Sequence, residues 1–310
     1  MRILKAVVAI VLGLIVYASA FQRQVALAMV NKVVGGDQPC PWAQLAQYPW
    51  KVPRFVELQK EAEKSVVVEA EDAALGIQKI RTSGRTFWIK KEGKEMPGKS
   101  TLAYVLAEQS WIGESAPQFT VKKGDVVVDV GAHIGTFDDD ALRRGAAKCI
   151  LVEPDPVNVE CIRRNFAKEI AEGRIIVVPE GAWSSHSTLE FNTGIANSGS
   201  GSFLHKEVGA TSFKVPVRPL DEILAGLGIA HVDYIKLDIE GAEREALKGA
   251  ANTLKNSKPV LMLDSYHEPD DAIVLPKVIL AGNPAYKPNC VLCSPDPQGS
   301  RFIPYSVFYK

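Results

Sequence analysis

An acid and two glycines stand together in the stretch DVVVDVGAHIGTF, residues 125–137. Asp129 lies near the end of an apolar run, and Gly131 and Gly135 follow it. Glycine allows a tight turn and lets a ligand approach the main chain without a Cβ in the way. Ligands of an open parallel sheet lie beyond the carboxyl ends of its strands. The stretch therefore predicts a binding turn for a nucleoside-type ligand, with a structural glycine bend as the alternative.

Two nucleotide-derived cofactors compete for such a turn. A dinucleotide such as NAD needs a helix N-terminus for its pyrophosphate and usually the pattern G-x-G-x-x-G. The chain instead reads Gly-Ala-His-Ile-Gly, with His133 where the middle glycine would stand, and we count His133 with Asp129, Gly131 and Gly135 as cofactor-binding residues. S-adenosylmethionine carries no phosphate, and an acid such as Asp129 attracts its positive sulfonium. The turn thus favours S-adenosylmethionine over a nicotinamide cofactor.

The second apolar run ends in an acid that suits either cofactor. The segment CILVEPDP contains Glu153, eighteen residues after Gly135. A carboxylate there can accept hydrogen bonds from both hydroxyls of a ribose. Asp155 is better explained as a helix N-cap, because a first-turn proline follows it. We therefore predict that Glu153 binds ribose, with Pro154 beside it in the cofactor site.

The third apolar run is followed by PEGAW, residues 179–183. This is the position expected for residues that flank an adenine ring, here Glu180, Gly181 and Ala182. Trp183 either stacks on that ring or lies in the core. The next segment indicates a strand pair, STLEFN and SFKVPVR, joined by a Gly/Ser-rich loop that could cover a site.

The fourth run carries charges at alternate positions, with Lys236, Asp238 and Glu240 in YIKLDIEG. On a strand of period two these side chains share one face. A strand-end salt bridge before an acidic helix start explains Glu243 and Glu245, which suit the helix dipole. It does not explain Lys236, since a lysine in a central apolar strand is costly to bury without partners. We predict that Lys236, Asp238 and Glu240 are catalytic.

A histidine follows the fifth run in the letters LDSYHEP. His267 lies at the same predicted sheet edge as Asp264 and Tyr266. A histidine held beside acids is a plausible base for removing a proton from a substrate hydroxyl or amine. We include His267 among the catalytic candidates, with a hydrogen-bonded loop residue as the alternative.

The order of these runs predicts the fold. Short apolar runs alternate with segments of helical spacing, and runs that do not alternate internally are typical of strands covered on both faces. The runs cover residues 126–130, 149–153, 175–179, 234–239 and 259–264, and the helical segments include 156–171 and 242–254. We predict a doubly wound α/β fold with a mostly parallel, Rossmann-like sheet over residues 121–310.

The N-terminus predicts a membrane segment. Arg2 and Lys5 precede an uncharged run from Ala6 to Gln22. This pattern fits a single-pass anchor in residues 1–22, with a cleaved signal peptide and secretion as the alternative. We expect the membrane to be a partner of the protein through this segment.

Two further parts precede the α/β domain. Residues 31–60 are rich in proline and tryptophan without a sustained period, so we predict little regular structure and treat 23–64 as a connector. From Ser65, strand-like segments separated by glycines predict a small antiparallel β extension over 65–120. The letters STLAYVLAEQSWIGE near its end suit a short helix.

Charge and cysteine content restrict the partners and the metal chemistry. The chain has 36 basic and 36 acidic residues, so its overall charge does not favour nucleic acid. Five cysteines are too few for a dense disulfide framework. Cys149 lies in an apolar run and is expected in the core. Cys290 and Cys293 have the spacing of half a zinc site, but no second half completes it, so a turn with two small residues is the better interpretation.

Taken together, these motifs resemble a known family. The segments VVVDVGAHIGTF, ILVEPDPVNVECIRRNF, VRPLDEIL and VDYIKLDIEGAEREALKGA are similar, in order and spacing, to the FkbM family of S-adenosylmethionine-dependent methyltransferases. The resemblance covers roughly residues 85–270. It implies a class I methyltransferase domain, a seven-stranded sheet with its last strand antiparallel, and methyl transfer usually to a hydroxyl oxygen.

The resemblance also implies roles for particular residues. It places the glycine turn on the methionine side of the cofactor and Glu153 on its ribose. Lys236, Asp238 and Glu240 fall on the family's Lys-x-Asp-x-Glu-Gly signature. His267 falls where the family commonly has a histidine, although the chain has Asp264 where a glutamate is expected.

We therefore expect methyl transfer from S-adenosylmethionine to a hydroxyl of a sugar, glycan or small metabolite. Transfer from a sulfonium needs no metal, so we expect none. A NAD-dependent oxidoreductase is the rival from another enzyme class. A membrane-tethered binding protein that kept the fold without the chemistry is the second rival.

Overall fold

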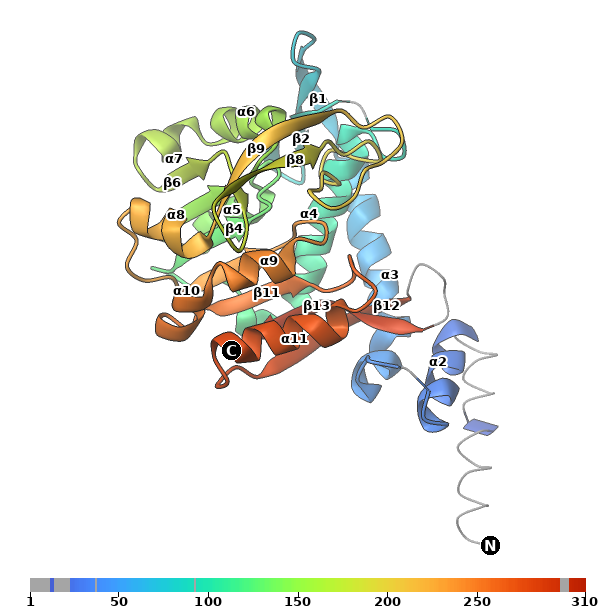
Figure 1. Ribbon diagram of the computed structural model, residues 1–310. Helices are drawn as coiled ribbons and strands as arrows, with labels where there is room; N and C mark the ends of the chain where they lie inside the picture. Colours follow the sequence, from blue (N-terminus) through green and yellow to red (C-terminus); the bar gives the residue numbers. More distant parts are fainter. Residues whose placement is uncertain (1–11, 14–22, 37, 92, 296–300) are drawn as a thin grey trace, which may run out of the picture.

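A seven-stranded sheet forms the centre of the protein (Figure 1). The computed structural model describes residues 12–13, 23–36, 38–91, 93–295 and 301–310. The strand order is β12-β13-β11-β10-β4-β5-β6. The five parallel strands are β4 (Val126–Val130), β5 (Lys148–Val152), β6 (Ile175–Val178), β10 (Tyr234–Leu237) and β11 (Val260–Asp264). Each overlaps one predicted apolar run, so the predicted parallel sheet is confirmed.

The antiparallel end of the sheet agrees with the fold that the resemblance implies. The last strand of the chain, β13 (Phe302–Tyr309), runs antiparallel to β11 and also pairs with β12 (Pro288–Pro295). The seven-stranded sheet with an antiparallel last strand is therefore confirmed.

Helices cover both faces of the sheet, as predicted for a doubly wound fold. The helices after β4 and β5 are α5 (Thr136–Arg143), α6 (Pro156–Asn165) and α7 (Ala167–Ala171). Those on the later crossovers are α8 (Leu220–Gly226), α9 (Glu243–Lys248), α10 (Ala251–Asn256) and α11 (Asp271–Gly282). The two predicted helical segments, 156–171 and 242–254, are each divided into two shorter helices.

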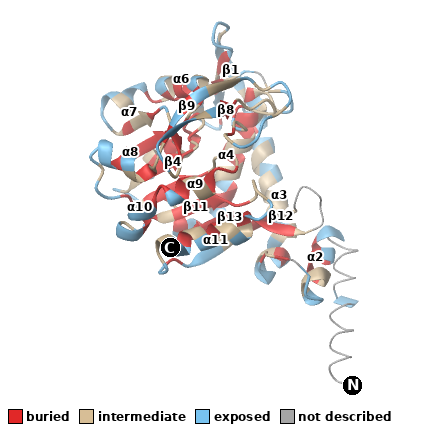
Figure 2. Ribbon diagram, in the orientation of Figure 1, coloured by how far each residue is buried: buried red, intermediate tan, exposed pale blue. Residues whose placement is uncertain are grey.

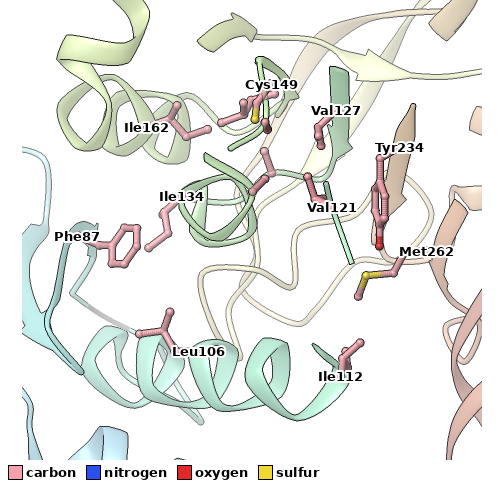
Figure 3. Packing of buried hydrophobic residues seen from close by; sticks show 14 of the residues in the cluster. Phe87, Leu106, Ile112, Val121, Val127, Ile134, Cys149, Ile162, Tyr234 and Met262 are labelled. Atoms are coloured by element: carbon pink, nitrogen blue, oxygen red, sulfur yellow. The ribbon is translucent and has the colours of Figure 1, made fainter. Parts of the chain in front are cut away.

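Successive side chains of each strand point to opposite faces of the sheet, so the sheet lies between two hydrophobic cores. Val127, Cys149 and Tyr234 face one core, which α4 (Gly98–Ser115), α5 and α6 cover, and Figure 3 shows Leu106 and Ile112 of α4 beside this face. Their chain neighbours face the other core, under α8, α9, α10 and α11. Figure 2 shows the central strands as the most buried part of the molecule. Cys149 is fully buried, which confirms its predicted place.

The predicted β extension and strand pair are both present. Strands β1 (Val67–Asp72), β2 (Ile77–Thr82) and β3 (Arg85–Lys90) form an antiparallel meander that precedes α4, and a 3-10 turn, η1 (Pro117–Phe119), leads into the large sheet. Strands β8 (Ser187–Asn192) and β9 (Ser212–Arg218) match STLEFN and SFKVPVR, and they form a second small sheet with β7 (Gly181–Ala182). The domain boundaries themselves stay predictions.

The prediction of irregular backbone in residues 31–60 is wrong. Helix α2 (Arg23–Val33) and the long helix α3 (Trp42–Lys64) occupy most of the segment, and α3 contains Pro49 and Pro53. A proline inside a helix removes one hydrogen bond and clashes with the preceding turn. Long-range contacts outweigh this cost, because α3 packs on α4 and β12 and Arg54 forms two hydrogen bonds with Glu114. Such contacts leave no local signal in the sequence.

The interpretation of Cys290 and Cys293 as a turn is also wrong, because both lie on β12. Cys293 forms a disulfide with Cys40, across a sequence separation of 253 residues. The bond joins the segment between α2 and α3 to the sheet, beside a small core that contains Leu45 and Phe302. The Cys290 thiol lies 3.6 Å from the Cys293 sulfur.

The predicted membrane segment, residues 1–22, lies outside the described residues except for Leu12 and Gly13. Within the described part of the chain, no helix has the length and apolar character needed to cross a membrane. Membrane anchoring therefore stays a prediction.

The disulfide predicts a stability difference between two serine variants. Cys40→Ser should lower the free energy of unfolding under non-reducing conditions, by at most about 5 kcal/mol, since the bond closes a very long loop in the unfolded chain. Cys290→Ser, which changes the neighbouring free thiol, is the control and should change it by less than about 1 kcal/mol. Urea unfolding measures both, and equal values for the two variants would contradict the assignment.

Candidate active site

A cavity of about 370 Å³ opens at the carboxyl ends of the central strands, a volume within the range of small-molecule sites. Most of the predicted site residues line it, although they come from four separate turns. These lining residues are Asp129, Gly131, His133, Glu153, Pro154, Glu180, Gly181, Ala182, Lys236, Asp238 and Glu240. Gly135 and His267 do not line the cavity, but each is next in the chain to a residue that does. The structure therefore brings together the groups that the sequence analysis selected.

A buried ion pair joins the two central strands at the floor of the cavity. Lys236 lies directly beside Asp129 in the parallel register of β10 and β4, and its Nζ is 3.1 Å from Asp129 Oδ1. The same ammonium donates to the carbonyl of Gly131 at 3.3 Å and lies 3.8 Å from Asp238 Oδ2. Burial alone lowers the pKa of Lys236, but the charges of Asp129 and Asp238 outweigh burial and raise it. The lysine is thus a permanent cation.

The first turn is shaped by close backbone contacts. Gly131 and Gly135 both have φ of +84°, a left-handed conformation that glycine adopts without strain. A Cβ at Gly131 would stand 1.9 Å from the carbonyl oxygen of Asp238, and one at Gly135 would stand 2.3 Å from the Phe166 ring. Gly131 therefore lets the ends of β4 and β10 meet, and Gly135 lets the turn pack against Phe166 at the end of α6, in addition to any room that they leave for a ligand.

Glu153 is held by backbone donors. Its Oε2 accepts from the His133 N–H at 2.8 Å, and its Oε1 accepts from the Asp155 N–H at 2.9 Å. Oε1 also accepts from Asn158 Nδ2 at 3.4 Å, so Oε2 is the oxygen that keeps a lone pair for a ribose hydroxyl. Burial, with the nearby charge of Asp155, raises the pKa of Glu153 to about 7. Asp155 caps α6 by accepting from the N–H groups of Val157 and Asn158, which confirms its predicted role.

The Gly/Ser-rich loop between β8 and β9 contacts this part of the site. The Ser198 hydroxyl is 2.7 Å from His133 Nε2, and its carbonyl accepts from Asn158 Nδ2 at 3.1 Å. Burial lowers the pKa of His133 to about 4, so its ring is neutral at pH 7. Residues 197–199 of the loop line the cavity. The predicted position of the loop, over a site, is confirmed.

The turn after β10 directs two carboxylates toward the cavity. Glu240 has φ of +51°, an uncommon conformation for a residue with a Cβ, and its carbonyl accepts from the Ser202 hydroxyl at 2.8 Å. The side chains of Asp238 and Glu240 are each one third exposed. Burial raises the pKa of Glu240 to about 7.

His267 stands behind these carboxylates. Its Nδ1 is 2.9 Å from Glu243 Oε1, and its side chain is only 5% exposed. Burial by itself lowers the pKa of His267, but the hydrogen bond with Glu243 and the charges of Glu240 and Asp238 raise it to about 10. A histidine with this pKa is protonated at pH 7, so the predicted role as a free base is not favoured in this arrangement. Glu243, which the sequence analysis explained by the helix dipole, is in fact the partner of His267.

Helix α4 contributes residues that the sequence analysis did not select. Glu108 and Tyr104 line the cavity at helical spacing, and the Tyr305 hydroxyl of β13 donates to Glu108 and lies 3.2 Å from the Tyr104 hydroxyl. Burial raises the pKa of Glu108 to about 7. The helical period of residues 100–114 indicates a face but not what that face covers, so only the tertiary structure identifies them. Asp264 and Tyr266 also line the cavity, as the predicted edge requires.

A second acid lies under the glycine turn. Asp138, in the first turn of α5, is fully buried, and its carboxyl group is hydrogen-bonded to that of Asp129. Burial and the neighbouring Asp129 raise its pKa well above the ordinary value. We assign the proton of this pair to Asp138 and the negative charge to Asp129, which has Lys236 as its counter-ion.

The predicted stacking role of Trp183 is not supported. Its ring packs edge-on against Phe203 at a centroid distance of 6.1 Å and does not line the cavity, whereas Phe191 and Phe203 do. Glu180 lines the cavity with its carboxylate held by Arg218, at 2.5 Å from Nε.

The fold and the site define a class I methyltransferase-like domain, and comparison with known proteins identifies its family. The sequence profile described as "Methyltransferase FkbM domain" matches residues 129–280, which include all the predicted site residues. Residues 129–280 are therefore a domain of the FkbM methyltransferase family.

Two curated proteins are similar to this chain. "Hexuronic acid methyltransferase AglP" of Haloferax volcanii is 28% identical over 142 residues, covering 46% of this chain and 56% of the relative. "Methyltransferase sdnD" of Sordaria araneosa is 27% identical over 153 residues, covering 40% and 59%. The chain thus spans less than two thirds of the length of these relatives. A solved methyltransferase FkbM from Methylobacillus flagellatus aligns with a TM-score of 0.47 and 19% identity, covering 86% of this chain and 60% of that one.

The contact at Gly131 predicts a large effect of one methyl group. Gly131→Ala should destabilise the protein by about 2 to 4 kcal/mol, because the new Cβ would overlap the Asp238 carbonyl and the residue would keep a left-handed φ. Gly228→Ala is the matched control, since Gly228 has φ of +69° but open space around its Cβ, and it should cost about 1 kcal/mol. Chemical denaturation measures both, and equal losses would contradict the close contact.

The raised pKa of Glu153 predicts a pH dependence of cofactor affinity. An acid whose pKa is about 7 accepts ribose hydrogen bonds fully only above that pH, so affinity for a ribose-containing ligand, tested with S-adenosylmethionine, should fall as pH drops from 8 to 6. Glu153→Gln should bind about 10-fold more weakly at pH 8 and lose this part of the pH dependence. Calorimetry of both proteins at pH 8 and pH 6 gives the ratio of their dissociation constants at each pH. The change of this ratio with pH isolates the contribution of Glu153. A ratio that does not change with pH would contradict the assignment.

Proposed function

We propose that this protein transfers a methyl group from S-adenosylmethionine to a hydroxyl oxygen of a sugar, glycan or small metabolite. The charge of the cavity carries the proposal. In the described part of the chain, eight carboxyl side chains and one lysine line it: Glu108, Asp129, Glu153, Asp155, Glu180, Asp238, Glu240, Asp264 and Lys236. Such a cavity attracts the positive sulfonium and repels a phosphate.

The same charges argue against a dinucleotide. A pyrophosphate would occupy the N-terminus of α5, where backbone N–H groups point toward the ligand. Here the first turn of that helix contains the buried Asp138, which lies against Asp129. An anionic ligand at this turn would meet the negative charge of Asp129, which lines the cavity, so a NAD-dependent oxidoreductase is disfavoured.

The residues of the chain fit S-adenosylmethionine along its whole length. Asp129 and the Gly131 turn would hold the methionine end, Glu153 the ribose, and residues 180–182 the adenine. The Glu153 Oε2 atom keeps a lone pair for a ribose hydroxyl, and the negative charge of Asp129, at the floor of the cavity, would face the positive end of the cofactor. When bound, the cofactor supplies a methyl group, which the acceptor oxygen takes as the carbon–sulfur bond breaks and sulfur keeps the electron pair.

The chain's own groups then position the acceptor and receive its proton. Lys236 fixes the carboxylates of Asp129 and Asp238, which limits where the acceptor hydroxyl can approach. We assign the hydroxyl proton to Glu108, because its carboxyl lines the cavity and its pKa of about 7 suits a base at neutral pH. The Tyr305 hydroxyl, which donates to Glu108, orients this carboxyl.

The choice of acceptor rests on the curated relatives. One of them is named as a hexuronic acid methyltransferase. A polyhydroxylated sugar or sugar acid is therefore the first acceptor class to test. The rival of a binding protein without catalysis is separated from the proposal by turnover, measured as transfer of labelled methyl groups to glycan, uronic acid and small-metabolite fractions.

The charge of Asp129 gives the test of the cofactor. Asp129→Asn keeps the shape of the side chain but removes the negative charge, so affinity for S-adenosylmethionine should fall by at least about 10-fold. Asp140→Asn, an exposed acid on α5 that pairs with Arg144, is the control and should bind normally. Calorimetry measures both affinities, and thermal unfolding confirms that both variants fold. Normal binding by folded Asp129→Asn would contradict the proposed site.

A further inference from the structure

Three potential metal ligands converge at the turn after β10, where Asp238 and Glu240 line the cavity and His267 lies close to both. His267 Nε2 lies 3.7 Å from Asp238 Oδ1 and 3.8 Å from Glu240 Oε2, and one ligand atom from each residue lies within 4.8 Å of the others. The histidine comes from the turn after β11 and the two acids from the turn after β10, so the arrangement is not a local consequence of sequence spacing.

The histidine is unpartnered at the nitrogen that faces the acids. Among the described residues, Nε2 has no hydrogen-bond partner, although the side chain is 95% buried. The other ring nitrogen, Nδ1, is held by the fully buried carboxylate of Glu243 at 2.9 Å. A metal ion would take the place of the proton on Nε2, while Nδ1 keeps its own proton and donates to Glu243. The lone pair of Nε2 would then point between Asp238 and Glu240. A carboxylate behind a histidine in this way is the usual support of a metal-binding imidazole.

We propose that Asp238, Glu240 and His267 bind one divalent metal ion, and that this ion binds the acceptor substrate through its oxygen atoms. Two carboxylates and one imidazole, with positions left open toward a cavity, suit Mn²⁺ and related divalent ions better than Mg²⁺, which prefers oxygen ligands alone. Ligand atoms of one ion at about 2.1 Å lie about 3.0 to 3.5 Å apart. The two distances from His267 would therefore need to shorten by less than about 1 Å, and the distance between the two carboxylate oxygens, which is within 4.8 Å, by less than about 2 Å.

The position of Lys236 is compatible with an ion at this point. Its ammonium lies 3.8 Å from Asp238 Oδ2, whereas the histidine faces the other oxygen, Oδ1. The Asp238 carboxylate can therefore bind the metal ion through Oδ1 while its Oδ2 faces the lysine ammonium. The Gly131 carbonyl and Asp129 hold the lysine on its own side.

The role of this metal ion in binding the acceptor rests on the proposed function. Asp238 and Glu240 line the same cavity as the turn and Glu153. A metal ion there would favour an acceptor that offers two neighbouring oxygens, such as a vicinal diol or a hydroxyl beside a carboxylate. The matching acceptor class is a sugar or sugar acid, rather than an isolated alcohol. The ion would hold one hydroxyl in place beside the cofactor site.

The test measures metal binding alone, without cofactor or acceptor. The full chain is treated with a chelator and titrated with Mn²⁺, and the loss of the free Mn²⁺ signal in electron paramagnetic resonance gives the number of sites and the affinity. We expect one site per chain. Asp238→Asn, Glu240→Gln and His267→Gln should each weaken binding by roughly 10-fold or more. Pulsed measurements should show a nitrogen coupling in the parent protein that His267→Gln lacks.

A nearby pair provides the matched control. His205 Nε2 lies 2.8 Å from Glu268 Oε1, so it is another histidine and glutamate in contact, but it is outside the proposed ligand set. His205→Gln should bind Mn²⁺ as the parent does. Thermal unfolding shows which variants fold. Mn²⁺ should raise the unfolding temperature of the parent and of His205→Gln, in which the site is intact, but not that of the three ligand variants.

Three results would overturn the inference. They are no Mn²⁺ binding by the parent at about 1 mM, equal binding by all three folded ligand variants, and a bound ion without the nitrogen coupling. The first would show that a proton on Nε2, rather than a metal, stands between the acids. A protein that binds S-adenosylmethionine but no metal keeps the proposed function, whereas one that binds metal but not the cofactor loses it.

Discussion

The site depends on one buried ion pair, between Lys236 and Asp129. Parallel register places the two residues side by side on the central strands, and the 3.1 Å contact allows each charge to exist where water is excluded. Removing one partner of such a pair leaves an uncompensated buried charge. The same ammonium also balances Asp238, so one lysine supports acids from two turns. The pair is therefore both the centre of the cavity's charge and a bond between β4 and β10.

The turns around this pair are held by backbone contacts rather than by side-chain packing alone. Gly131 lies under the Asp238 carbonyl, and Glu153 accepts from two backbone N–H groups. The Ser202 hydroxyl donates to the carbonyl of Glu240, whose own backbone is left-handed. Strained or crowded backbone of this kind persists where the surrounding structure holds it, and it concentrates at functional sites. Here it directs a set of carboxylates into a single cavity.

Much of the fold and many of the site residues could be predicted because they follow local periods. The five parallel strands coincide with apolar runs, and the alternation along them places Asp129, Lys236 and Asp264 on the face that lines the cavity. The segments that could not be predicted depend on distant partners. Helix α3 persists despite two prolines because α4 and β12 support it, and Cys40 finds Cys293 across most of the chain.

The sequence by itself determined the strands, the turns at their ends, and the chemical types that those turns present, since these properties are set by residues a few positions apart. Only the tertiary structure decided the partners: Glu243 behind His267, Glu108 of α4 opposite the acids, and Ser198 of the loop on His133. These contacts arise when separate layers pack together. Their geometry depends on how helices and loops from distant segments fit the sheet, which no local period encodes.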